Sequence, residues 1–325
     1  MSTEVIKREN VLLRICKLVW TEYSIALVLV FIFVLAGIIA PRFFTASNIL
    51  IILRQASIIG MIALGMTFVI IIGGIDLSSG HSVAAAGAAL IVLQGNENVP
   101  MFVAILASFA LATFIGFANG IFVTKFRLPP FIVTLAIGIM ARSIALNQLG
   151  GQSLSGRRVP EFTNIGLGSV GVIPNALIVW IVFTIIFACI LKYTKFGASL
   201  YAVGGNEVAA KYSGIAVNKV KLLAFTIAGF CVGVATLLDL SRMAAVAPAT
   251  TGDMYEFDAI TAVVVGGTSL AGGKGRILNT VFGVIIIQSI SNIMIMFGLS
   301  PFLNGMLRGA IILIAVLLQR RDKAV

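Results

Sequence analysis

Residues 58–93 read IIGMIALGMTFVIIIGGIDLSSGHSVAAAGAALIVL, two apolar runs separated by the short polar interruption GGIDLSSGH at 73–81. The predicted helices 56–73 and 77–93 are each close to the length that crosses a hydrocarbon core of about 30 Å, which leaves almost no room for a loop. Glycines and serines break a helix there, and non-helical backbone at such depth is tolerated only where protein buries it or it lines an aqueous cavity. The sequence therefore predicts a broken helix near the middle of a membrane.

Asp76 is the one acidic residue in this stretch. A carboxylate at the bilayer centre costs about 2.5–3.5 kcal/mol on insertion scales, so such a residue is expected to have a specific role. Two interpretations stay open. Asp76 caps the following helix with help from Ser78 and Ser79, or it contacts a transported solute.

Polar side chains inside apolar segments are candidates for lining a translocation path, although each could instead hydrogen-bond a neighbouring helix. The candidates are residues around the break and two asparagines that lie in other apolar segments. We predict that the path is lined by Gly73, Gly74, Asp76, Ser78, Asn119 and Asn292.

The rest of the chain is also strongly apolar. Of its 325 residues 59% are hydrophobic and only 11% charged, and its mean hydropathy is +1.10, values that exclude a soluble globular domain. Glycine pairs four residues apart, at 116/120, 229/233 and 305/309, are typical of helices that approach closely in lipid. We predict an all-α polytopic membrane protein of about ten transmembrane helices, at 24–40, 56–73, 77–93, 100–124, 128–149, 174–191, 220–240, 257–270, 277–297 and 301–318.

The distribution of charge predicts the orientation. The net charge is +11, from 23 basic and 12 acidic residues, which in a soluble protein would suggest nucleic acid. Sixteen of the basic residues fall in the two termini and in loops on one side of the predicted helices, which favours orientation by positive loops and no nucleic-acid partner. We therefore predict an N-in, C-in topology, with residues 1–23 as a cytoplasmic arm, 24–318 as the transmembrane domain and 319–325 as a cytoplasmic tail.

Motifs for catalysis, cofactors or metals are not found in the sequence. The glycine-rich segment 266–275 resembles a phosphate loop, but alignment on Gly273-Lys274 puts Thr268 at the first glycine and Gly275 at the required Ser or Thr. The cysteines and the single histidine are too scattered for a disulfide framework, a metal site or a catalytic set: Cys16, Cys189, Cys231 and His81. We predict that the chain is not an enzyme and binds no cofactor, so that energy for transport comes from elsewhere.

A short helix with defined ends is predicted within the basic segment 192–219. Asn206 is a good N-cap, and Glu207 suits the positive end of the helix dipole. Gly214 is placed to end the helix.

Val208 and Tyr212 lie four residues apart in this helix and give it an apolar edge. The segment itself is too short to cover that edge, so either the membrane surface or a partner covers it. We favour a docking helix for a cytoplasmic partner.

Five blocks of sequence carry a resemblance to a known family. They are NILIILRQAS at 48–57, GMTFVIIIGGIDLSSG at 65–80, PFIVTL at 130–135, AVGGNEVAAKYSGIAVNKVK at 202–221 and FDAITAVVVGGTSLAGGKGR at 257–276. In their order and spacing the chain resembles the permease subunits of ribose-type ATP-binding-cassette importers of monosaccharides in bacteria. Ser79 departs from the pattern, since the family commonly has valine there.

The resemblance implies an ATP-driven importer of ribose or a related sugar that works by alternating access in the bacterial inner membrane. It implies four kinds of partner: a second, identical or different permease subunit, cytoplasmic ATPase subunits that carry ATP and Mg²⁺, an extracytoplasmic sugar-binding protein, and the lipid bilayer. In this family a short cytoplasmic helix couples the permease to the ATPases. The motif match carries that role to Asn206, Glu207, Val208, Ala209, Ala210, Tyr212, Ser213, Gly214 and Ile215.

Three points stay open. A secondary transporter driven by an ion gradient is the main alternative, and a non-transport scaffold is another. An ion-coupled carrier usually has several intramembrane acids, whereas we expect only Asp76 and Asp239.

Contacts to the binding protein are expected at Arg157, Arg158 and Glu161 in the outer loop. A weak echo between 71–80 (IIGGIDLSSG) and 264–273 (VVGGTSLAGG) is either an internal repeat or a coincidence.

Overall fold

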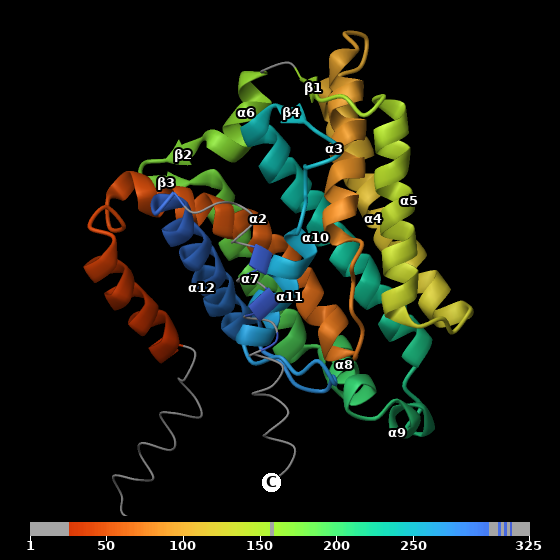
Figure 1. The fold of residues 1–325 in the computed structure, drawn as a ribbon. Helices are drawn as coiled ribbons and strands as arrows, with labels where there is room; N and C mark the ends of the chain where they lie inside the picture. The colour runs from red at the N-terminus through yellow and green to blue at the C-terminus, as the bar shows by residue number, and fades with distance from the viewer. Residues whose placement is uncertain (1–25, 157–158, 299–304, 307–308, 311–312, 314–325) are drawn as a thin grey trace, which may run out of the picture.

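The computed structural model describes residues 26–156 and 159–298 together with residues 305, 306, 309, 310 and 313, and it is mainly helical (Figure 1). Its helices are Ala26–Ile39, α2 (Ala46–Ile71), α3 (Ser79–Gly95), α4 (Met101–Lys125), α5 (Pro130–Gln148), α6 (Pro160–Leu167), α7 (Asn175–Tyr193), α8 (Lys195–Gly205), α9 (Glu207–Tyr212), α10 (Val217–Met243), α11 (Tyr255–Val265) and α12 (Ile277–Met296). Two antiparallel pairs of two-residue strands join β1 (Leu154–Ser155) to β4 (Ala245–Val246) and β2 (Ser169–Val170) to β3 (Ile173–Pro174).

Helix length and composition confirm the predicted class. Six described helices are long and apolar enough to cross a membrane: α2, α4, α5, α7, α10 and α12. The chain is therefore an all-α, multi-pass membrane protein. The predicted count of about ten goes beyond these six, because α3 and α11 have only 17 and 11 residues and Ala26–Ile39 is also short.

Parts of the prediction fall outside the described residues. The arm 1–23, the tail 319–325 and nearly all of the predicted tenth helix, 301–318, are among them. Within the described part, the predicted helix 56–73 begins ten residues earlier, at Ala46. Arg54 does not end it, because its guanidinium donates a hydrogen bond to the carbonyl of Leu167 (3.1 Å).

The helix α2 lies at the centre of the bundle. It packs against α7, α10, α11 and α12, and every residue from Ala56 to Ile71 is buried. A helix that is apolar all round is either packed among other helices or exposed to lipid, and its burial shows that this part of α2 is packed among helices. The apolar run that opened the sequence is thus the axis around which the other helices pack.

Glycines set the distance between α4 and α10. A Cβ atom on Gly116 of α4 would lie 2.7 Å from the Cα of Gly229 of α10, and a Cβ on Gly120 would lie 3.1 Å from the Cα of Leu222. The backbones can approach so closely only because these side chains are missing. The predicted packing role of the pairs 116/120 and 229/233 is therefore confirmed, whereas 305/309 has no described neighbour within 4 Å.

Two short helices are each preceded by a non-helical segment inside the bundle, extended before α3 and made of turns before α11. Residues 74–78 lead into α3, and residues 247–254 lead from β4 into α11. The first turns of the two helices meet, since the backbone of Gly80 touches that of Gly252 and the carboxylate of Glu256. Figure 1 shows α3 in the upper half of the molecule and α11 in the lower half. The predicted interruption at 73–78 is present between α2 and α3, but it follows α2 at its full length of 26 residues and does not divide one membrane-spanning helix. A second interruption, before α11, faces it.

The α4–α10 contact makes a test of the fold. We expect Gly229→Ala to destabilise the protein by about 1–3 kcal/mol, because the new methyl group would lie 2.6 Å from the carbonyl oxygen of Ala112. Thermal unfolding in detergent measures the loss. Gly95→Ala at the end of α3, where no atom lies within 4 Å, is the control, and equal unfolding temperatures for both variants would contradict the packing argument.

Candidate functional site

The helix α2 ends at the first of the predicted glycines. Gly73 adopts a left-handed backbone conformation (φ 76°), and its amide donates to the carbonyl of Ile70 while the amide of Gly74 donates to that of Val69, both at 2.9 Å. This is the usual way for a helix to end, because glycine has no Cβ to clash in that conformation. The chain then turns back into the bundle in extended form.

Asp76, Ser78 and Asn119 come together in this extended segment. The Oδ1 atom of Asp76 accepts hydrogen bonds from the amide (2.8 Å) and the hydroxyl (2.6 Å) of Ser78. The amide group of Asn119 on α4 donates to the same hydroxyl (2.7 Å). All three side chains are at most 2% exposed. We call these three residues the Asp76 cluster.

The predicted capping role of Asp76 is wrong in its detail. The N-cap residue of α3 is Ser78, and its side chain makes no capping bond to the helix. Asp76 instead bonds two residues ahead, the local turn that aspartates commonly form. The carboxylate therefore orders the segment that leads into α3 and does not cap the helix itself.

Thr134 of α5 supports the same segment from the other side. Its hydroxyl accepts a hydrogen bond from the amide of Leu77 (3.1 Å) and lies 3.2 Å from the carbonyl oxygen of Ile75. Extended backbone inside a bundle needs such partners, since each unsatisfied group costs several kcal/mol in lipid. The sequence pointed to Thr134 only as part of the block PFIVTL at 130–135, because no local pattern tells which helix contacts the break.

Asn292 does not belong to the Asp76 cluster. It lies on α12 and exchanges two hydrogen bonds with Asn48 of α2, at 2.9 and 3.0 Å. Asn48 also donates to the carbonyl of Phe43 (2.9 Å). The geometry of this pair favours the alternative reading of Asn292, a hydrogen bond between neighbouring helices.

The expectation that Asp76 and Asp239 are the only intramembrane acids is wrong. Glu256 and Asp258 in the first turn of α11 are 6% and 3% exposed. The predicted helix 257–270 already contained Asp258, and its boundary left out Glu256, which the structure places in the first turn of α11. The Oε2 atom of Glu256 touches Gly80 and has no hydrogen-bond partner among the described residues.

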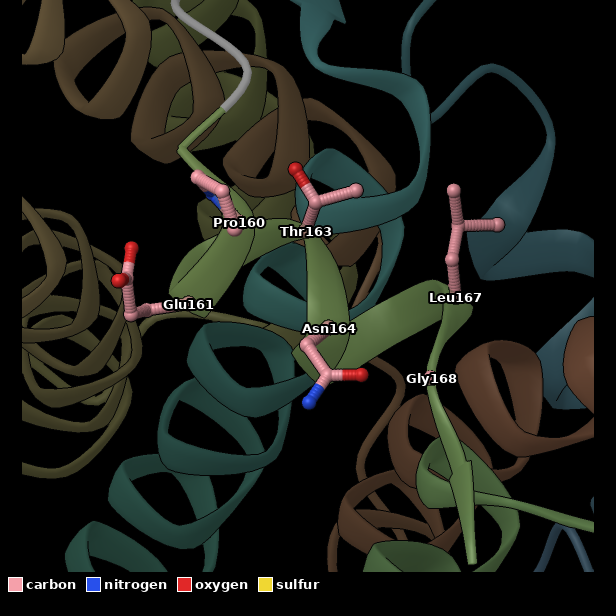
Figure 2. A pocket seen from close by; sticks show the side chains of 6 residues that line it. All are labelled: Pro160, Glu161, Thr163, Asn164, Leu167 and Gly168. Carbon is pink, nitrogen blue, oxygen red and sulfur yellow. The ribbon is translucent and has the colours of Figure 1, made fainter. Parts of the chain in front are cut away.

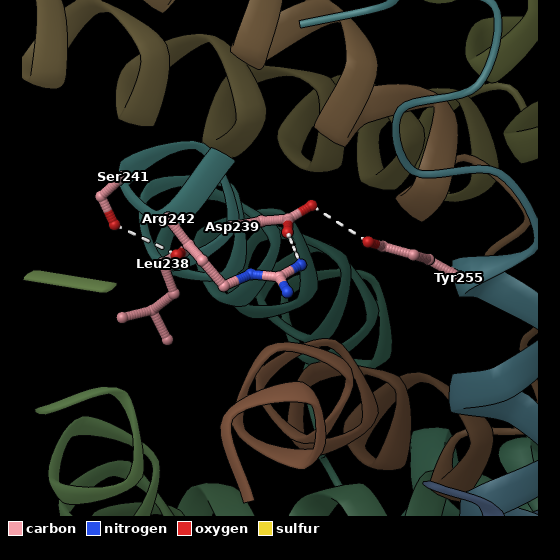
Figure 3. A network of polar contacts seen from close by, with 5 residues as sticks. All are labelled: Leu238, Asp239, Ser241, Arg242 and Tyr255. Atoms are coloured by element: carbon pink, nitrogen blue, oxygen red, sulfur yellow. Dashed lines mark hydrogen bonds and ion pairs between the residues drawn. The ribbon is translucent and has the colours of Figure 1, made fainter. Parts of the chain in front are cut away.

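Asp239, in contrast, is neutralised by its neighbours. Figure 3 shows Arg242 and Tyr255 reaching its carboxylate from two sides. The guanidinium of Arg242 donates to Oδ1 and the hydroxyl of Tyr255 donates to Oδ2, both at 3.0 Å. A buried carboxylate with an ion pair and a second donor is a structural element that ties α10 to α11.

Arg142 holds the series of turns that precedes α11. Its guanidinium donates to the carbonyls of Ala249 (3.0 Å) and Thr251 (2.9 Å). His81 lies nearby, against Gly138 of α5. Within the described residues no group of three or more His, Cys, Asp or Glu is arranged to hold a metal ion.

The predicted docking helix is α9, and its ends are as predicted. The side chain of Asn206 accepts a hydrogen bond from the amide of Ala209 (3.0 Å), and Glu207 occupies the first turn. Gly214 ends the helix in a left-handed conformation (φ 81°), and the amide of Ile215 donates to the carbonyl of Ala210 (3.1 Å). The sequence missed α8, which lies before α9 with only Asn206 between them.

The apolar edge of α9 is uncovered by the described residues. Val208 is 64% exposed and Tyr212 is 89% exposed, whereas Ala210 on the other side is buried. Glu207 forms an ion pair with Lys221 of α10 (2.6 Å), which fixes the start of α9 against the long helix. The exposed edge thus belongs to a helix whose start is held against α10 by an ion pair.

An open depression lies at the opposite end of the molecule from α9 (Figures 1 and 2). It has a volume of about 550 Å³ and is lined by Pro160, Glu161, Thr163, Asn164, Leu167 and Gly168 around α6. Glu161 is one of the three residues expected to contact a binding protein. The other two, Arg157 and Arg158, lie outside the described residues.

Comparisons with known proteins agree with this architecture. Residues 48–316 match the family model described as "Branched-chain amino acid transport system / permease component". The chain is 40% identical over 295 residues to the ribose import permease RbsC of Haemophilus influenzae, covering 89% of this chain and 90% of that one. It is 40% identical over 292 residues to RbsC of Bacillus subtilis (90% of each) and 35% identical over 307 residues to RbsC of Escherichia coli (93% and 94%). No solved structure matches the chain.

The matches define the class first: the chain is a permease component of a transport system and is not itself an enzyme. More narrowly, it belongs to the family of ribose-type permeases of ATP-binding-cassette importers, as the resemblance in its five sequence blocks indicates.

The hydroxyl of Ser78 makes a test of the Asp76 cluster. We expect Ser78→Ala to destabilise the folded protein by about 1–3 kcal/mol, because the amide of Asn119 loses its buried acceptor and Asp76 loses a donor. Thermal unfolding in detergent measures this. Ser199→Ala on α8 is the matched control, since that hydroxyl is exposed and bonds only within its own helix; an equal effect of the two substitutions would contradict the assigned role.

Proposed function

We propose that this chain is the membrane-spanning subunit of an ATP-driven importer of ribose or a closely related monosaccharide. Relatives named ribose import permeases, aligned over about nine-tenths of both chains, support the sugar. The exposed apolar edge of α9 carries the rest of the proposal, because it offers a place where a separate ATPase subunit can dock. ATP and Mg²⁺ are then bound by that partner, and the chain itself binds no cofactor.

The topology proposed for this importer is ten crossings with both termini in the cytoplasm of a bacterium, in its inner membrane. Residues 1–23 and 319–325 are then the cytoplasmic arm and tail, and 24–318 is the permease domain. Lys125 ends α4, Lys192 ends α7, and Lys211 lies on α9, so basic residues gather at the α9 end. Positive charge on cytoplasmic loops supports this orientation.

Coupling is proposed to run through segment 192–219. Closure of two ATPase subunits on ATP displaces α9, and the residues Asn206 to Ile215 carry that displacement into the permease. A nucleotide state shifts the conformation only if it binds one conformation more tightly than the other. The edge formed by Val208 and Tyr212 is the surface that we assign to this differential contact, with Lys211 beside it for an acidic rim.

The sugar enters from the α6 end in this proposal. An extracytoplasmic binding protein docks over α6, where Glu161 and Asn164 line the open depression. Two permease subunits, identical or different, enclose the path. The Asp76 cluster is proposed to fix the shape of the path through the extended segment before α3, and its burial supports that indirect role over contact with sugar.

A secondary transporter driven by an ion gradient is the second candidate. One observation favours it: the Oε2 atom of Glu256 is buried between the first turns of α3 and α11 without a described hydrogen-bond partner. Intramembrane acids of this kind are typical of ion-coupled carriers. The family and the docking helix favour the ATP-driven importer.

The ion pair between Glu207 and Lys221 at the start of α9 allows a test of coupling that does not depend on folding. We expect Glu207→Lys to reduce ATP-dependent, vanadate-sensitive sugar uptake in reconstituted vesicles by about tenfold or more, because two like charges then meet where the pair was. Membrane insertion and assembly should be unchanged. The exchange Glu207→Lys with Lys221→Glu is the matched control and should restore part of the uptake; full uptake by Glu207→Lys alone would overturn the assignment of α9.

The two candidate functions predict different results for Glu256→Gln. The ATP-driven importer keeps uptake within about threefold of the wild type, since the amide has the same shape and no proton to exchange is required. An ion-coupled carrier loses gradient-driven uptake altogether. Uptake is measured in vesicles with ATP alone and with a proton or sodium gradient alone. If the wild type takes up sugar with the gradient alone and Glu256→Gln abolishes that uptake, the ion-coupled carrier replaces the ATP-driven importer as the proposed function.

A further inference from the structure

Three glycine pairs from distant parts of the chain meet at the α9 end of the bundle. They are Gly73-Gly74 after α2, Gly204-Gly205 at the end of α8, and Gly272-Gly273 in the turn between α11 and α12. The amide of Gly273 donates a hydrogen bond to the carbonyl of Ile71, the last residue of α2 (2.9 Å). We call Gly73, Gly204, Gly272 and Gly273, whose backbones lie against one another, the glycine junction.

The contacts in the junction are between backbones. A Cβ on Gly272 would lie 2.8 Å from the carbonyl oxygen of Gly204 and 3.0 Å from the amide nitrogen of Gly73. A Cβ on Gly204 would overlap the carbonyl oxygen of Ile71 and lie 2.6 Å from the nitrogen of Gly273. No side chain fits between the three segments, so any displacement of one segment meets the backbone of the next directly.

A tyrosine adds a polar contact beside the junction. The hydroxyl of Tyr201 on α8 donates to the carbonyl of Gly275 (2.8 Å). Burial raises the pKa of this hydroxyl, so it stays a donor at physiological pH. The turn itself is closed by hydrogen bonds from the amide of Ser269 to the carbonyl of Lys274 (3.0 Å) and from the amide of Gly272 to that of Ser269 (2.9 Å). The segment that resembles a phosphate loop is therefore a packed turn.

The junction lies between the two regions that transport has to connect. On one side, only Asn206 separates Gly205 from α9. On the other side, Gly73 stands three residues before Asp76, whose cluster orders the extended segment before α3. Close-packed protein interiors transmit displacement because they have little compressibility.

We propose that the glycine junction is the positioning element through which a displacement of α9 reaches the extended segment before α3, so that ATP hydrolysis is coupled to passage of the sugar there. The inference rests on the proposed function, since it needs an ATPase docked on α9. It assigns positioning roles to Gly204, Gly272, Gly273 and Tyr201. None of these four residues contacts ATPase or sugar in the proposal.

Gly204→Ala and Gly205→Ala are a matched pair for testing the junction. The methyl group on residue 204 would overlap the carbonyl of Ile71, whereas at Gly205 no atom lies within 4 Å of the new methyl group. The two variants are compared in the full transporter, with its ATPase and binding-protein partners, in vesicles. We measure sugar transported per ATP hydrolysed, with ribose as the probe. The ratio should fall roughly 2- to 30-fold for Gly204→Ala, the range of 0.5–2 kcal/mol for altered coupling, and be unchanged for Gly205→Ala.

Tyr201→Phe keeps the junction testable if Gly204→Ala does not assemble. It removes one hydrogen bond and no packing volume, and it should lower the same ratio about twofold or more. Tyr193→Phe, at an exposed tyrosine at the end of α7, is its control and should leave the ratio unchanged.

Two outcomes distinguish failure of the inference from failure of the proposed function. If Tyr201→Phe, and Gly204→Ala where it assembles, keep the wild-type ratio, or lose uptake and ATP hydrolysis in equal proportion, the junction has a structural role only and the inference is overturned. If the wild-type complex transports ribose without ATP, the proposed function fails first.

Discussion

The structure depends on one constraint: backbone amides and carbonyls inside a lipid-embedded bundle must find partners within the protein. Helices satisfy them automatically, but the extended segment before α3 does not. Its amides are satisfied one at a time, by the carbonyl of Val69 for Gly74, by Thr134 for Leu77 and by Asp76 for Ser78. Two of the contacts also join the segment to other helices, because Thr134 belongs to α5 and Asn119 of α4 completes the Asp76 cluster. The break therefore organises the packing around it.

The second non-helical segment, the series of turns before α11, obeys the same constraint with different residues. Arg142 supplies donors for the carbonyls of Ala249 and Thr251, and the short pair of β1 and β4 satisfies part of the backbone that precedes it. The first turns of α3 and α11 meet at Gly80, so two positive helix ends lie close together. Carboxylates of the chain itself, Asp76 and Glu256, lie there. The chain's own carboxylates therefore lie next to the positive ends of both helices.

The features that were predicted correctly are those that depend on a few neighbouring residues of the sequence. The helix break at Gly73, the cap at Asn206 and the close packing at Gly116 and Gly229 each follow from a few neighbouring residues. The burial of Glu256 and the contacts of Thr134 could not be read in this way, because they depend on which distant helix lies opposite. The echo between 71–80 and 264–273 places a glycine pair after a helix end in both copies, after α2 and after α11. Aligned by sequence, Gly73 matches Gly266, but the left-handed glycines are Gly73 and Gly267, one residue out of register.

The contacts at the Asp76 cluster and at the glycine junction are of two kinds, and only those at the junction allow neighbouring segments to shift against each other. Around the Asp76 cluster, directional hydrogen bonds between buried side chains hold the break in one arrangement, and altering any of them leaves a buried polar group unpaired. At the glycine junction, a backbone hydrogen bond from Gly273 to Ile71 and a side-chain hydrogen bond from Tyr201 to Gly275 join the described segments, and the other contacts between the glycines are backbone surfaces without side chains. Such surfaces can slide by small amounts without unpairing polar groups, yet they cannot interpenetrate. An element that passes displacement to the extended segment before α3 as one unit, without breaking the hydrogen bonds inside it, needs this combination, and it explains why glycines of three separate segments are gathered next to α9.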